Sequence, residues 1–155
     1  MKARAEKPGA SFLKWITLAG CLVLAGAAAF GVGVSGDQVQ RAWQAYLVNF
    51  LFWTGLALGS VLISAVLTIT HARWGRPVKR LAEAPATFLP LAFVLFWLLY
   101  LGKDQIFPWI REPIPQKAAW LNPGFLFARD GLSLFLLTAL ALGILYFSVR
   151  DDLSF

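Results

Sequence analysis

The sequence predicts an all-α membrane protein, in which four transmembrane helices form one unit of a larger helical membrane core. Of its 155 residues, 59% are hydrophobic and only 14% are charged, and the mean hydropathy is +0.67. A soluble domain carries about 25% charged residues, and a chain of this size cannot enclose so much apolar surface in one core. These observations exclude a soluble enzyme and require lipid as part of the solvent.

Four uncharged stretches are the expected spans, because crossing a hydrocarbon core of ~30 Å takes about 20 helical residues. They cover residues 15–34, 45–70, 84–102 and 131–149. The third stretch contains Pro85 and Pro90, so we expect its first turns to be irregular or kinked. The expected organisation is a basic N-terminus, one membrane domain and a short tail, at residues 1–14, 15–149 and 150–155.

The basic residues lie in the connecting segments, although the formal net charge is +6. Nine of the fourteen Lys and Arg residues fall in the N-terminus, the second loop and the C-terminus, and five fall in the other two loops. Positive loops are retained on the cytoplasmic side, so we predict that both termini are cytoplasmic. Anionic lipid, rather than nucleic acid, is the expected partner of the basic segments.

Redox centres and proton pumping are not expected of this chain alone. One Cys and one His cannot form a disulfide, a haem site with two histidines or an iron–sulfur cluster. We therefore predict no catalytic residue and no metal site. The predicted spans contain no Asp, Glu, Lys or Arg, so a proton relay would lack a titrating group. The polar side chains available to such a relay are Asn49, Thr54, Ser60, Ser64, Thr138 and Tyr146.

Small residues mark the expected helix contacts, since they let backbones approach closely in lipid. One stripe recurs every four residues along the first span, at Cys21, Ala25, Ala29 and Gly33. The second span carries Gly55-x-x-x-Gly59 and a polar row, Ser60, Ser64 and Thr68. Packing within the four-helix unit is the simpler interpretation of both stripes. The alternative is contact with helices of another chain.

The second and third loops carry the remaining candidates. His71, Trp74 and Arg76 are weak candidates for binding a quinone or a lipid headgroup. Four cations near Trp74 suit anionic headgroups, and the alternative is contact with a quinone or a partner subunit. The third loop, at residues 103–130, mixes proline with aromatic residues, which favours a segment along the membrane interface or docked against another subunit.

Several ordered segments resemble the F subunit of bacterial alternative complex III. The first runs from Arg41 to Trp53, with the sequence RAWQAYLVNFLFW. It is followed by ARWGRP at 72–77 and RLAE at 80–83, and then by KAAWLNP at 117–123 and the segment 125–129. The resemblance covers roughly residues 38–150. Members of this family are usually at least twice as long, with about ten spans, so the resemblance implies a short or split form.

The resemblance implies a role in a quinol:electron-acceptor oxidoreductase of the bacterial inner membrane. Its implied partners are a polysulfide-reductase-like C subunit, an iron–sulfur subunit and multihaem cytochrome c subunits. Haem c and iron–sulfur clusters would belong to those partners, while this chain would act as a scaffold and contribute to a quinone or proton pathway. The alternative function is a stand-alone multi-pass membrane scaffold or lipid-binding protein without electron transfer.

Overall fold

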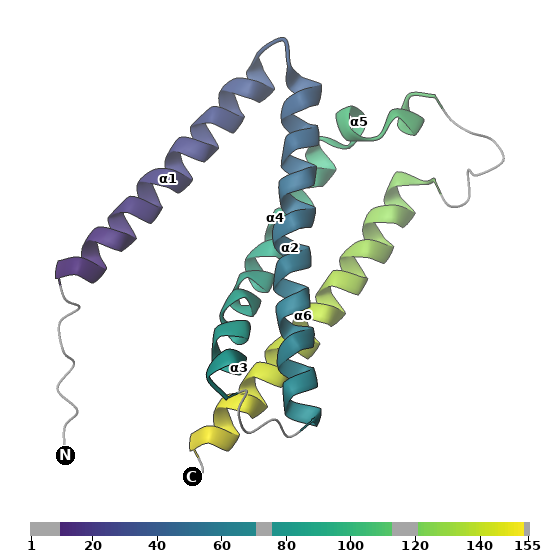
Figure 1. Ribbon diagram of the computed structural model, residues 1–155. Helices are drawn as coiled ribbons and strands as arrows, with labels where there is room; N and C mark the ends of the chain where they lie inside the picture. Colours follow the sequence, from purple (N-terminus) through teal and green to yellow (C-terminus); the bar gives the residue numbers. More distant parts are fainter. Residues whose placement is uncertain (1–9, 71–75, 113–120, 154–155) are drawn as a thin grey trace. The chain divides into compact units, whose positions relative to one another are not determined.

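The computed structural model describes residues 10–70, 76–112 and 121–153, and every regular element in these ranges is a helix (Figure 1). The elements are α1 (Ala10–Ser35), α2 (Val39–Ile69), α3 (Arg76–Glu83), η2 (Ala84–Phe88), α4 (Leu89–Leu101), α5 (Lys103–Ile106), η3 (Pro108–Ile110) and α6 (Pro123–Leu153). Four segments are long and apolar enough to cross a membrane, namely Phe12–Ser35, Val39–Ile69, Val78–Leu101 and Pro123–Ser148. The predicted fold class is confirmed.

The third and fourth spans begin earlier than the uncharged stretches indicate. The third begins at Val78, because α3 continues through the 3-10 helix η2 into α4. The irregular turns predicted from Pro85 are confirmed, since η2 carries this proline and replaces an α-helix there. The fourth begins at Pro123, where Oδ1 of Asn122 accepts a hydrogen bond from the Gly124 N–H at 2.9 Å and so caps the helix.

The chain divides into two compact units, residues 1–42 and 43–155, and each is described by itself. In the first unit, α1 approaches the start of α2 closely. A Cβ placed on Gly33 would lie 3.1 Å from the Cβ of Ala42. A Cβ at position 33 would therefore make a tight contact with Ala42 within the first unit. The expectation of a single domain over residues 15–149 stays a prediction.

In the second unit, small residues let α2, α4 and α6 pack around one core. Ala57 of α2, Leu89 of α4 and Ala141 of α6 belong to a single buried cluster, which also includes Ala86 of η2. Since three of its four members are alanines, the helices can approach closely around Leu89. The core is therefore narrow at this level.

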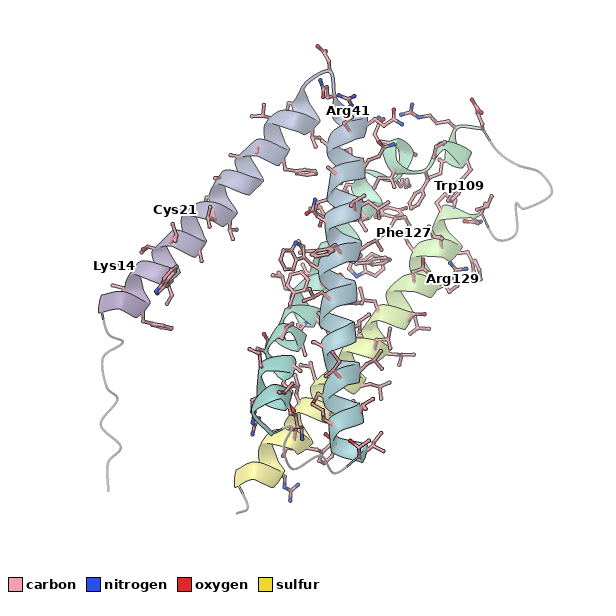
Figure 2. The ribbon with its side chains drawn as sticks, viewed as in Figure 1. Lys14, Cys21, Arg41, Trp109, Phe127 and Arg129 are labelled. Carbon is pink, nitrogen blue, oxygen red and sulfur yellow. The ribbon has the colours of Figure 1, made fainter. Side chains whose placement is uncertain are left out.

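Aromatic rings fill the core toward the other end of the second unit. The ring centroid of Phe96 lies 6.2 Å from that of Phe50 and 5.5 Å from that of Phe127. Phe127, labelled in Figure 2, also lies 5.1 Å from Tyr100 in an edge-to-face contact. The hydroxyl of Tyr46 donates a hydrogen bond to the Leu95 carbonyl at 2.9 Å, which ties α2 to α4. Ring contacts thus hold these helices together where alanines are absent.

Candidate functional site

A buried carboxylate joins three helices at one end of the second unit. Glu83, the last residue of α3, is only 5% exposed. Its Oε1 accepts a hydrogen bond from Ser148 Oγ of α6 at 2.6 Å and another from Ser64 Oγ of α2 at 3.0 Å. Both serines are themselves buried. We call Glu83, Ser64, Ser148 and Arg80 the Glu83 cluster.

Basic side chains of α3 lie on the outer side of this carboxylate. The guanidinium of Arg80 donates to Glu83 Oε2 at 3.1 Å, and Lys79 Nζ lies 4.0 Å from Oε1. Arg80 keeps 43% of its side chain exposed, so solvent screens its attraction for the carboxylate. The two serine hydroxyls that donate to the same carboxylate are shielded from solvent.

The sequence places these groups together through helical periodicity. Ser64 lies on the same face of α2 as the core residue Ala57, two helical turns away, and Ser148 lies on the same face of α6 as Ala141. The inner faces that pack around Leu89 therefore continue toward Glu83 and present hydroxyls there. Each hydroxyl has a single rotatable donor, and both donors are directed at one carboxylate oxygen.

This arrangement holds a negative charge and couples three helices to it. Hydrogen bonds to a charged group are worth about 1.5–3 kcal/mol each, about twice the value for neutral pairs. A carboxylate with two buried hydroxyl donors and two basic side chains beside it is therefore an interhelical clamp. In the described ranges, no group of three or more His, Cys, Asp or Glu side chains could hold a metal ion.

The helices that could span a membrane extend beyond the predicted uncharged stretches and carry charged side chains at their ends. The absence of an ionisable side chain from the uncharged stretches themselves holds in the sequence, and the depth of these stretches in a membrane stays a prediction. Glu83 lies within the third span, which the sequence prediction began one residue later. Arg129 and Asp130 lie within the fourth span and form an ion pair at 2.8 Å (Arg129 is labelled in Figure 2). About 28 Å of helix rise separates Arg129 from Ser148, close to the ~30 Å of a hydrocarbon core. The Arg129–Asp130 ion pair and the Glu83 cluster, which α6 joins through Ser148, therefore lie at the two ends of the apolar part of α6.

The stripe predicted on α1 lies in the first unit, which is described by itself. Cys21, labelled in Figure 2, is exposed, and so are Ala25 and Ala29. Gly33 has the Ala42 contact described above. Packing of the first three positions stays a prediction.

Gly55 and Gly59 occupy the face of α2 away from the core. A Cβ added at either position would meet no atom within 4 Å in the part of the chain that the structure describes. Close packing of these glycines within the second unit is therefore not observed. Contact with a helix of another chain, the alternative interpretation of the Gly55-x-x-x-Gly59 motif, stays a prediction.

The headgroup and quinone candidates fall at the edge of the described ranges. His71 and Trp74 lie outside them, and Arg76 is the first residue of α3. A quinone or lipid contact at these positions stays a prediction.

Sequence reasoning did not predict the Glu83 cluster as a unit. It singled out Ser64 within the polar row of α2, but it assigned Glu83 to a loop and left Ser148 unused. The signal that could have found the cluster is the pairing of a carboxylate at the start of one span with serines at the ends of two others. The second and fourth spans run in the same direction, so their C-terminal ends meet the start of the third.

Comparison of the chain with known protein families, with curated proteins and with solved structures found no match.

Proposed function

We propose that this chain is a membrane subunit of a bacterial quinol-oxidising electron-transport complex of the alternative complex III kind, in which it acts as a scaffold. The observation that carries the proposal is the position of the residues on which the resemblance depends. From the segment 41–53, Tyr46 bonds the Leu95 carbonyl of α4 and Trp43 lies against Gly102, directly after α4. From the segment 80–83, Arg80 and Glu83 belong to the Glu83 cluster. These segments supply several of the interhelical contacts of the second unit.

The apolar surface that α2 exposes in the second unit also supports membership of a larger helical assembly. Phe52, Trp53 and Leu56 are exposed beside Gly55. Large apolar side chains flanking a small-residue motif are typical of a helix that packs against another helix in lipid. In this proposal the α2 surface contacts a neighbouring subunit, and the complex's haem c and iron–sulfur clusters belong to partner subunits.

Gentle purification tests the proposal. The tagged full chain, isolated from bacterial membranes in a mild detergent, should carry haem c absorbance and iron, together with the subunits that bind them. A matched purification with the Gly59→Leu variant should yield less of both, because the larger side chain separates the helices. Recovery of the unsubstituted chain with lipid alone, free of haem and iron, would favour the stand-alone scaffold or lipid-binding function instead.

A second variant tests the scaffold role itself. His71→Ala should leave the haem and iron content of the purified complex unchanged, since a scaffold supplies no ligand to either centre. Selective loss of one haem or one cluster, with all subunits still present, would refute the role.

A further inference from the structure

We infer that a layer in the middle of the second unit, formed by Thr54, Ala92 and Thr138, binds an internal water molecule. Thr54 and Thr138 are each only 7% exposed, and Ala92 is fully buried. The hydroxyl oxygen of each threonine is buried and has no hydrogen-bond partner in the part of the chain that the structure describes. Two unpaired hydroxyls in an apolar core are costly, because each has been removed from water without compensation.

The three residues share one level of the bundle. Between α2 and α4, Phe50 contacts Phe96, and Ala57 and Leu89 belong to one cluster. On α2, Thr54 lies between Phe50 and Ala57. On α4, Ala92 lies between Leu89 and Phe96. The helices run in opposite directions, so this register sets Thr54 level with Ala92.

The same reasoning sets Thr138 at this level. Ala141 of α6 belongs to the Leu89 cluster, whereas a Cβ on Gly131 would lie 3.2 Å from Phe96. Thr138 lies between these two positions of α6 and shares their buried face. Each of the three helices therefore contributes a small side chain to one level, between a layer around Leu89 and a layer of aromatic rings.

The depth of the layer favours a ligand shared by the two hydroxyls. Ten residues separate Thr54 from Ser64 and Thr138 from Ser148, so the layer lies about 15 Å of helix rise from the Glu83 cluster on both helices. That is half the thickness of a ~30 Å hydrocarbon core, where bulk water does not reach. A buried water needs two to four polar partners, and two hydroxyls that both donate and accept supply that minimum.

Other hydroxyls of these helices show what a satisfied side chain looks like. Thr68 Oγ1 donates to the carbonyl of Ser64 at 2.8 Å, and Ser60 Oγ donates to that of Ala57 at 2.6 Å. Both bonds are made within α2. Thr54 and Thr138 depart from this pattern, since neither hydroxyl bonds a carbonyl of its own helix in the described part of the chain.

A double-mutant cycle on the full chain, unfolded reversibly in mixed detergent micelles, tests the inference. Thr54→Val and Thr138→Val should each raise the unfolding constant about three- to ten-fold, the worth of one hydrogen bond. The double variant should be little less stable than either single variant, because the first substitution already releases the water. Thr68→Val, which removes a hydroxyl bonded within its own helix, is the matched control and should change the constant less than two-fold.

Three results would overturn the inference. They are a lower unfolding constant for either valine variant, an unchanged constant for both, and effects that multiply in the double variant. A structure of the unsubstituted chain in a lipid nanodisc gives an independent test that needs no variant. Ordered solvent density about 2.7–3.2 Å from both threonine oxygens is expected, and continuous apolar packing between them would contradict it.

Discussion

Ser148→Ala should destabilise the second unit by removing the shortest hydrogen bond of the Glu83 cluster. Ser148 Oγ lies 2.6 Å from Glu83 Oε1, and both side chains are buried. A hydrogen bond to a charged acceptor is worth about 1.5–3 kcal/mol. Ser64 still donates to the same oxygen after the substitution, so we expect a cost near the middle of this range, about 2 kcal/mol.

The free energy of unfolding, measured for the full chain in mixed detergent micelles with helical circular dichroism as the signal, is the assay. Ser133→Ala is the matched control, since Ser133 is an exposed serine of the same helix and bonds the Arg129 carbonyl at 2.9 Å. Its substitution should cost less than about 0.5 kcal/mol. The same measurement in a Glu83→Gln background tells whether the serine acts through the carboxylate.

With a neutral acceptor at position 83, the cost of Ser148→Ala should fall to about 1 kcal/mol, the value for an uncharged hydrogen bond. An equal cost in the two backgrounds would mean that Ser148 stabilises the bundle by some other contact. Equal stability of Ser148→Ala and the parent chain would refute the clamp altogether.

Three further predictions concern packing and topology. Gly102→Ala should cost about 1–3 kcal/mol of unfolding free energy, because the added Cβ would overlap the buried indole of Trp43; parental stability would contradict this packing. Gly59→Leu should leave the unfolding of the isolated chain nearly unchanged and yet weaken its assembly with partner subunits. Co-purification of the partner subunits measures this, with Gly59→Ala as the control variant. Full assembly of the leucine variant would show that this face meets lipid. Cysteines placed at Lys79 and Lys117 in a cysteine-free background should be labelled from the cytoplasm and the periplasm respectively, and the reverse pattern would overturn the predicted orientation.

The number of spans and the irregular start of the third could be predicted from the sequence, because charge-free length and proline chemistry act locally. The close approaches between helices could not. Gly55 and Gly59 carry the familiar motif, yet the glycines that touch neighbouring rings are Gly102 and Gly131. Periodicity tells which residues share a face of one helix. Which face meets which neighbour depends on the register between helices, and a single sequence does not display it.

The same limit explains the missed part of the Glu83 cluster. A carboxylate directly before an apolar stretch has the composition of a loop, and burial becomes apparent only when two other helix ends arrive beside it. Ser64 could be recognised as part of a polar row. Its partner could not be recognised, because 19 positions and a change of chain direction separate the two residues.

The order in which the Glu83 cluster is completed follows from the order of synthesis. Ser64 and Glu83 emerge from the ribosome close together, whereas Ser148 follows Glu83 by 65 positions. Until the last helix has been made and inserted, the carboxylate has one buried donor and must keep part of its water shell. Arrival of α6 removes that water and closes the cluster. Insertion of the final span is therefore the step that commits the second unit to its mature packing, and a chain truncated before residue 148 would leave a charged group hydrated at the membrane edge.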